Sequence, residues 1–255
     1  MNHLKNIFSC LCLILIIGLL AGCGQPDVQP MIPNDAPWEN GEISLYRVLD
    51  RSGEFAGNAT ISVHTGSHIE NSPARDVGWT IIRDVAAPDG TELLMVEVTQ
   101  KGIRPIYSRL IRGSQRGQEQ VAATYNNGQV DLELTTYRDV TTYERVQIPS
   151  NSRDYRTLLL LVRSLPLAEG YATRINSFLP IAGTQERVQL VVRGQEEVTV
   201  PAGTFNTWQT EITLSDAKIR AWIGTETPYP LYKFTDGRTD ASFEMSEFTA
   251  SADAN

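Results

Sequence analysis

Apolar and polar residues alternate with a period of two across most of residues 42–249, and this constrains the fold more than any other feature. The runs are rich in β-branched and aromatic residues, and turn sequences such as Pro88-Asp89-Gly90 and Asn126-Asn127-Gly128 separate them. The pattern predicts an antiparallel meander. We expect its strands at 43–48, 55–64, 78–84, 92–99, 106–112, 118–125, 130–137, 141–148, 186–192, 197–200, 207–214, 218–223, 231–234 and 242–248.

One segment departs from the β pattern and predicts a helix over 151–165. Asn151 or Ser152 can cap its start, and Pro166 stops it. Its apolar residues recur at spacings of three and four: Tyr155, Leu158, Leu159, Val162 and Leu165. A sheet of this size must close, curl or split to avoid exposed edges. We therefore expect one mainly β domain over 41–249, a large antiparallel curled sheet forming a barrel or half-barrel with one main α-helix packed on or in it.

The N-terminus predicts where the protein works. Residues 1–22 have a positive start at Lys5 and a short apolar run, and Leu19-Leu20-Ala21-Gly22-Cys23 resembles the lipobox of bacterial lipoproteins. That resemblance implies cleavage before Cys23 and acylation of this cysteine, which would anchor the protein to a membrane. Gly24 stands where aspartate would signal inner-membrane retention, so the resemblance favours the outer membrane in a cell with two membranes. Residues 23–40 predict a flexible spacer, and 250–255 a disordered tail.

Composition excludes several classes of function. All three cysteines lie within residues 1–23, so the exported domain has no thiol for a disulfide, an iron–sulfur cluster or a nucleophile. Without the signal peptide and its Lys5, 21 basic residues face 30 acidic ones, a net charge of −9. This balance disfavours nucleic acid as a partner.

Several segments together resemble a bacterial envelope family known as domain of unknown function 3108. The most specific piece is Val200-Pro201-Ala202-Gly203-Thr204-Phe205 followed by Trp222. Other matching pieces are the opening from Gly41 to Val48, Gly57-Asn58-Ala59, the helix with Arg163 before Leu165-Pro166-Leu167, the run from Gly194 to Thr199, and Pro230-Leu231-Tyr232-Lys233. The resemblance implies a half-barrel similar to lipoprotein carriers and sensors, and it implies no molecular function. Thr225-Glu226-Thr227-Pro228-Tyr229 departs from the lysine- and aspartate-rich turn that is more usual there.

No catalytic or metal-binding constellation is visible in the sequence. His64 and His68 are four apart, but Gly66 and the strand pattern argue against a helix, and no third ligand lies nearby. No Gly-x-Ser-x-Gly elbow occurs, and Gly113-Ser114-Gln115-Arg116-Gly117 lacks the central serine. Glu196 and Glu197 are adjacent in a strand and point to opposite faces, so they cannot act together. We expect no metal, no cofactor and no enzymatic activity.

Aromatic residues and arginines within the strands provide the candidate binding groups. Aromatic residues such as Trp79, Trp208 and Trp222 either form the core or line a cavity for an acyl chain or another apolar ligand. Arg83, Arg104, Arg109, Arg112, Arg187 and Arg193 alternate with apolar neighbours, which favours outward-facing charges. The alternative is that they bind anionic glycan or lipid headgroups at the rim of the sheet.

Two functions therefore remain open as the main alternatives, and a third has less support because no catalytic constellation is visible. The first is a non-enzymatic protein that binds a lipid or other apolar envelope molecule between sheet and helix. Its predicted lining and lid are Trp79, Tyr155, Leu158, Leu159, Val162, Trp208 and Trp222, and a moving helix would hinge at Ser164-Leu165-Pro166 and Ala168-Glu169-Gly170. The second is a structural or assembly protein with a packed core that binds another envelope protein. The third is an enzyme acting on cell-wall polymer.

Overall fold

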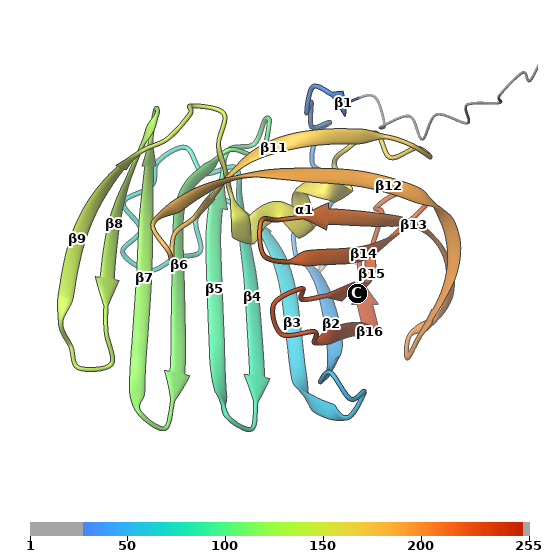
Figure 1. The fold of residues 1–255 in the computed structure, drawn as a ribbon, viewed down its shortest axis with the longest axis horizontal. Coiled ribbons are helices and arrows are strands. Elements are labelled where there is room, and N and C mark those ends of the chain that lie inside the picture. Colours follow the sequence, from blue (N-terminus) through green and yellow to red (C-terminus); the bar gives the residue numbers. More distant parts are fainter. Residues whose placement is uncertain (1–27, 252–255) are drawn as a thin grey trace, which may run out of the picture.

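The computed structural model describes residues 28–251. The predicted signal peptide, Cys23 and residues 252–255 of the predicted tail lie outside the described residues. Sixteen strands within this part of the chain form one curled sheet, which is antiparallel apart from two short pairings. The prediction of a mainly β half-barrel is confirmed (Figure 1).

Two meanders make up the sheet. The first runs through β2 (Glu42–Leu49), β3 (Phe55–Thr65), β4 (Trp79–Ala87), β5 (Gly90–Val98), β6 (Pro105–Ser114), β7 (Gly117–Asn126), β8 (Gln129–Thr135) and β9 (Thr141–Gln147). The second runs through β11 (Ala172–Leu179), β12 (Thr184–Val200), β13 (Gly203–Thr213), β14 (Lys218–Gly224), β15 (Leu231–Thr235) and β16 (Ser242–Thr249). They join where β16 pairs with β2.

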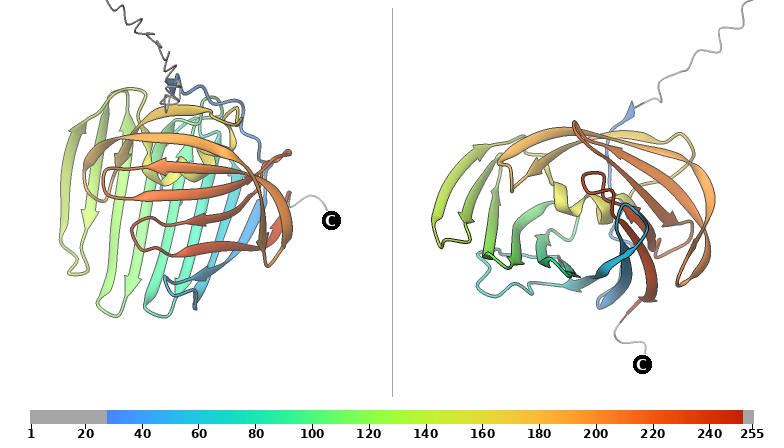
Figure 2. Two further views of the ribbon diagram at one scale, coloured as in Figure 1. Left: turned by 45° about the vertical axis from the view of Figure 1, so that its right-hand side comes forward. Right: turned by 60° about the horizontal axis from the view of Figure 1, so that its bottom comes forward.

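This topology places β9 and β11, which are consecutive long strands in the chain, near opposite edges of the sheet. Their connection must therefore cross the open side of the half-barrel. It carries β10 (Arg153–Asp154), the 3₁₀ turn η1 (Tyr155–Thr157) and α1 (Leu158–Arg163). Figure 2 shows the short helix inside the curl of the sheet. Beyond β11, the short strands β1 (Val28–Gln29) and β10 pair with it in parallel.

Side chains bring the two ends of the sheet together where backbone pairing does not. Within residues 28–251, no ladder joins β9 to β11. Instead, Phe178 of β11 packs against Ala123, Val130 and Leu132 of β7 and β8. Its ring meets that of Tyr125 edge to face, with centroids 6.2 Å apart. The sheet therefore curls far enough to share a small apolar cluster across its opening.

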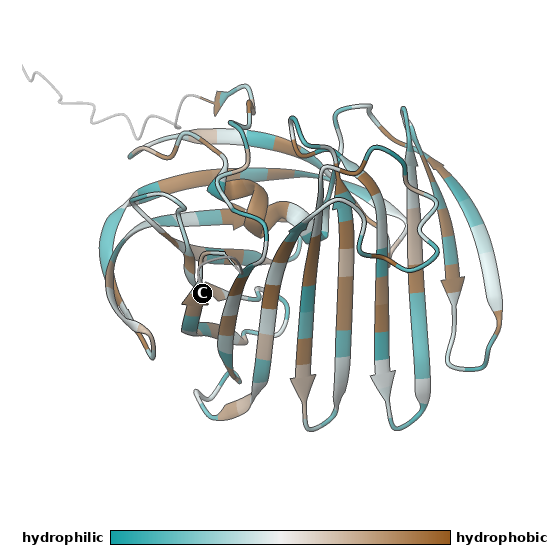
Figure 3. Ribbon diagram, turned by 180° about the vertical axis from the view of Figure 1, so that it is seen from behind, coloured by the Kyte–Doolittle hydropathy of each residue, from teal (hydrophilic) through white to brown (hydrophobic). Residues whose placement is uncertain are grey.

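The main core lies on the inner face of the curl, as the period-two alternation predicts. Along β3, Ala59, Ile61 and Val63 are buried while the residues between them are not. A similar alternation recurs along several other strands, such as β2 and β12, and hydrophobic and hydrophilic residues follow one another along the sheet (Figure 3). Leu158, Leu161 and Val162 of α1 join this core from the open side.

The helix is shorter than the sequence predicts, so the range 151–165 is wrong. Arg153 and Asp154 form a strand pairing with β11, and Tyr155–Thr157 wind as a 3₁₀ turn before the six-residue α1 begins. Neither Asn151 nor Ser152 is the cap, because the side chain of Asp154 accepts the hydrogen bond from the Arg156 amide. Parallel pairing with β11 competes successfully with the helical pattern at these positions.

Two strand predictions also need correction. Strand β11 is not among the predicted strands, because its polar residues Thr173 and Ser177 are fully buried and hide the alternation. The predicted strands 186–192 and 197–200 are one strand, β12. The sequence pattern is interrupted where the structure has a register shift, between Val192 and Gly194. A bulge allows a strand to bend there without ending.

Residues 28–40 are not the flexible spacer that their composition predicts. Val28 and Gln29 pair with Ala172 and Thr173, and the Asn34 amide donates a 2.8 Å hydrogen bond to the Ser164 carbonyl. The Trp38 side chain is buried and meets Trp79 edge to face. Burial of a large aromatic ring fixes this segment against the core.

A buried ion pair fastens the helix to the sheet. Arg163, the last residue of α1, donates from Nη1 and Nη2 to the two carboxylate oxygens of Glu42 in β2, at 2.6 and 2.9 Å. Both side chains are 1–2% exposed. The guanidinium also donates to the carbonyls of Tyr229 and Pro228 and lies 5.7 Å from the centroid of the Trp38 ring. Arg163 therefore joins the helix, the first long strand and the β14–β15 turn.

Breaking this pair should strongly destabilise the fold. We expect Arg163→Met to lower the free energy of unfolding by about 3–5 kcal/mol, because it leaves the Glu42 carboxylate buried without its partner. Urea denaturation of the exported chain without its lipid anchor, residues 24–255, measures this. The matched control Arg145→Met removes the exposed pair with Asp131 and should cost about 1 kcal/mol or less. Equal losses in the two variants would contradict the assignment.

Candidate functional site

Asp154 organises the turn that leads into α1. Its fully buried carboxylate accepts hydrogen bonds from the Arg156 amide at 2.8 Å and from the Tyr125 hydroxyl at 2.7 Å. Burial raises the pKa of Tyr125 well above its usual value, and the neighbouring negative charge of Asp154 adds to the effect. The phenol therefore stays protonated and ties η1 to β7.

A cavity of about 750 Å³ lies between this turn and the inner face of the sheet. It is partly open to solvent, and strands of both meanders contribute to its walls. Its volume falls in the range of about 300–1,000 Å³ that is typical of small-molecule sites. The wall is mostly apolar. Its larger apolar residues are Val48, Phe55, Val85, Tyr155, Leu158, Leu159, Ile219, Phe234 and Phe243.

Charged residues interrupt the apolar wall on β4, β5 and β6. Glu92 lies opposite Arg112 in the β5–β6 ladder, and Arg112 donates from Nε to a Glu92 oxygen at 2.8 Å. Arg83 of β4 donates to the other oxygen of the same carboxylate. Burial alone would raise the pKa of Glu92, but the two guanidinium groups outweigh it and lower the pKa. The carboxylate is therefore charged and shared between two arginines.

Tyr155 closes one side of the cavity through the β15–β16 loop. Arg238 of this loop donates from Nη1 to the Tyr155 hydroxyl at 3.0 Å, and its guanidinium lies 5.2 Å from the centroid of the tyrosine ring. Arg238 is itself held by an ion pair with Asp216 at 3.0 Å. Because Thr235, Asp236 and Thr239 also line the cavity, the loop and the turn form a continuous rim.

The seven residues predicted to line a site are divided between three places. Tyr155, Leu158 and Leu159 line the cavity. Trp79 and Val162 are buried in the core, and Trp208 packs partly buried against it.

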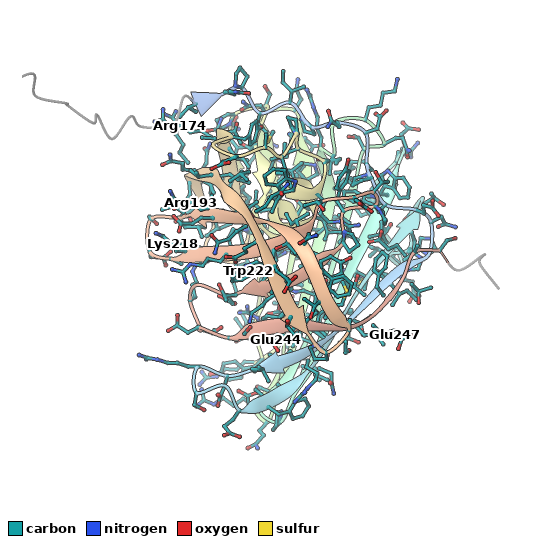
Figure 4. All side chains as sticks on the ribbon, turned by 90° about the vertical axis from the view of Figure 1, so that its right-hand side faces the viewer. Arg174, Arg193, Lys218, Trp222, Glu244 and Glu247 are labelled. Carbon is teal, nitrogen blue, oxygen red and sulfur yellow. The ribbon has the colours of Figure 1, made fainter. Side chains whose placement is uncertain are left out.

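Trp222 is on the outer face, not in a lining. Figure 4 shows it there with Arg193, Lys218 and Glu244. Its indole donates to Glu196, and the ammonium group of Lys233 lies 5.6 Å from the centroid of its ring.

The prediction that strand arginines face outward is wrong for Arg83 and Arg112, which line the cavity. The sequence contained the signal: Arg83 has the same parity in its strand as the buried Trp79 and Ile81, and Arg112 the same parity as the buried Leu110. Glu92 likewise shares the parity of Leu94 and Val96. Arg156, Phe234 and Phe243 also line the cavity but are not among the predicted lining residues.

The histidines come together without forming a metal site. The rings of His64 and His68 have centroids 4.7 Å apart. Their Nε2 atoms hydrogen-bond to the Ser62 hydroxyl and the Thr65 carbonyl, at 3.1 Å each. Among residues 28–251, no group of three or more His, Cys, Asp or Glu side chains could hold a metal ion.

Within the described part of the chain, no helix has the length and apolar character needed to cross a membrane. The fold and the site define an open antiparallel half-barrel with a short helix and an amphipathic cavity on its inner face. The family described as "Protein of unknown function (DUF3108)" matches residues 43–238, and this chain belongs to it. The resemblance seen in the sequence is thereby confirmed.

One solved structure has a similar fold. The chain is similar to the crystal structure of a beta-barrel-like protein of domain of unknown function DUF1849 from Brucella abortus, with 10% identity and a TM-score of 0.52 over 83% of this chain and 98% of that one. A "putative lipoprotein" from Parabacteroides distasonis also matches at 10% identity, over 88% and 100% of the two chains, with a TM-score of 0.29. No match was found among curated proteins.

The role of Asp154 can be tested by a double-mutant cycle. We expect Asp154→Ala to destabilise the protein by about 1–3 kcal/mol, since it removes a cap and leaves the Tyr125 hydroxyl buried without its acceptor. Tyr125→Phe removes that hydroxyl, so the double variant should lose less stability than the sum of the single variants. Thermal unfolding of the unmodified protein, the two single variants and the double variant gives the coupling free energy between the two residues. Strict additivity of the stability losses would contradict the described contact.

Proposed function

We propose that this protein is a non-enzymatic bacterial envelope lipoprotein that binds a lipid or another apolar envelope molecule in the cavity between its sheet and α1. The observation that carries the proposal is the partly open, mostly apolar cavity of about 750 Å³. A wall of this character gains free energy when apolar ligand surface replaces water, at about 25 cal/mol per Å² of buried area.

The lipobox supports the location of this binding site. An acylated Cys23 would hold the chain at a membrane, and Gly24 favours the outer membrane if the cell has two. Val28 and Gln29 pair with β11, so only a short segment separates the predicted anchor from the folded domain. The ligand would therefore be taken up close to the bilayer surface.

A second candidate function is a structural or assembly role in the envelope. Strand β9 lies at an edge of the sheet, and its residues are almost all exposed. Tyr143 on this strand is 76% exposed, and Val140 beside it is 54% exposed. An edge strand with exposed apolar groups can accept a strand from another protein. A partner that pairs with β9 would favour this role.

The decisive experiment is native mass spectrometry of residues 24–255, purified without detergent from the protein's own host. Denaturing extraction then identifies any bound small molecule. A lipid or other apolar compound near unit stoichiometry supports the binding role. An empty protein that also fails to bind acyl-chain probes would shift the conclusion to the assembly role.

Filling the cavity should block ligand binding without unfolding the protein. Leu159→Trp places a larger side chain on a half-buried position in the cavity wall. We expect it to weaken binding of the neutral fluorescent probe N-phenyl-1-naphthylamine about tenfold, which corresponds to about 1.4 kcal/mol. The control Val140→Trp adds the same ring at an exposed position and should leave binding unchanged. Unaltered binding in Leu159→Trp would place the probe elsewhere.

A further inference from the structure

The inner face of β4, β5 and β6 changes from apolar to charged inside the cavity. Ile81, Leu94 and Leu110 are buried and apolar. Continuing along the same faces, the next positions are Arg83, Glu92 and Arg112, all of which line the cavity. A fold needs only apolar residues at such positions, so the charged group requires another explanation.

Donors exceed acceptors in this charged group. Each guanidinium carries five N–H donors, and the single carboxylate of Glu92 is shared between Arg83 and Arg112. The Nε of Arg83 is buried and has no hydrogen-bond partner among the described residues. A compact anion with several oxygens is the ligand chemistry that matches unused guanidinium donors.

Arg156 adds a third guanidinium to the same cavity. Its Nη1 makes one long hydrogen bond, 3.4 Å to the Ser108 hydroxyl, and its buried Nη2 has no partner among residues 28–251. The neighbouring Asp154 already accepts hydrogen bonds on both oxygens. Burial lowers the pKa of Arg156, and the nearby positive charge of Arg83 acts in the same direction.

Apart from Glu92, the acidic residues of the cavity lie at its rim. Asp50 accepts hydrogen bonds from the amides of Ser52 and Glu54 within its own turn, at 2.8 and 3.0 Å. Asp236 accepts from the Arg238 amide at 2.8 Å. Asp89 lies in the β4–β5 turn and Glu119 is exposed. Three arginines therefore face one carboxylate, Glu92, on the wall, and the remaining negative charges lie at the mouth.

The apolar part of the wall adjoins the arginines. Leu158 and Leu159 lie two and three residues after Arg156 in the chain, and Phe234 and Phe243 of the cavity wall stack on each other with 4.3 Å between centroids. A ligand that fits this arrangement has an apolar tail and a small anionic head.

We propose that the cavity binds a single-chain amphiphile with a compact anionic headgroup, a carboxylate or a phosphate, and that Arg83, Arg112 and Arg156 bind the head while the apolar wall holds the tail. This inference rests on the proposed binding function and names the class of its ligand. The Glu92 carboxylate competes with the ligand head for two of the three arginines.

The test compares four ligands with the same dodecyl tail. Isothermal titration of residues 24–255, which contain every described residue, measures dodecanoate, dodecyl phosphate, dodecanol and dodecyltrimethylammonium, each below its micelle concentration. We expect both anions to bind at least tenfold more tightly than the alcohol and the cation. Preference for dodecanoate over dodecyl phosphate, or the reverse, identifies the headgroup.

Variants separate the headgroup site from the cavity itself. Arg156→Met should weaken dodecanoate binding about tenfold and leave dodecanol unchanged, since the alcohol needs only the apolar wall. The matched control Arg220→Met changes an exposed arginine whose β14 neighbours Ile219 and Ala221 are buried, and it should alter neither affinity. Glu92→Gln should change the affinity in the opposite direction and strengthen dodecanoate binding, because it frees the two guanidinium groups.

The outcomes distinguish this inference from the function on which it rests. If dodecanol and dodecanoate bind equally and Arg156→Met affects neither, the cavity binds apolar ligands and the anionic headgroup is refuted. If the cation binds most tightly, the acidic rim determines the specificity and the inference is again overturned. If none of the four ligands binds, the proposed function fails and this inference fails with it.

Discussion

The bidentate ion pair between Arg163 and Glu42 determines where the helix lies, and the rest of the architecture depends on that position. A buried charge without its partner is very costly, so alternative placements of α1 are strongly disfavoured. The same guanidinium holds the carbonyls of Pro228 and Tyr229 and faces Trp38, so one side chain joins four separate segments. Such a pair selects one arrangement more effectively than it raises overall stability.

Because the ion pair fixes α1 at its C-terminal end, space remains beyond its N-terminal end. A six-residue helix covers about 9 Å along its axis, which is too little to cover the inner face of a sheet this large. The inner positions beyond its N-terminal end remain uncovered and form the cavity. The short α1 and the hollow therefore have one cause, because residues that the sequence pattern assigns to the helix pair with β11 as β10. Ser164, a predicted hinge residue, is buried and donates from its hydroxyl to the Leu161 carbonyl at 2.7 Å, so the contacts favour a fixed helix.

The sequence predicted most strands because period-two alternation reports directly on a sheet with one buried face. It failed at β11, where strands on both sides and buried hydroxyls of Thr173 and Ser177 remove the contrast between faces. Arg83 and Arg112 differ from the prediction for another reason: a charged side chain predicts exposure, although the parity of each strand assigns both residues to the inner face. Trp222 shows the converse error, since an aromatic residue was assigned to the interior while its parity places it outside. The parity of a residue within its strand thus predicts the face of the sheet on which its side chain lies better than the residue type does.

Arg156 and its neighbours show that folding alone does not account for the cavity. A leucine at this position would extend the apolar wall formed by Leu158 and Leu159 and would remove a buried donor that has no partner. Burying an incompletely paired guanidinium lowers stability, and a bound anion would return much of that loss by supplying acceptors and opposite charge. The same reasoning explains why a single carboxylate, Glu92, lies between two arginines: it holds both guanidinium groups at the cavity wall while leaving donors unused. A stable empty core would need none of these charged residues, whereas a cavity that binds an anionic headgroup needs its arginines.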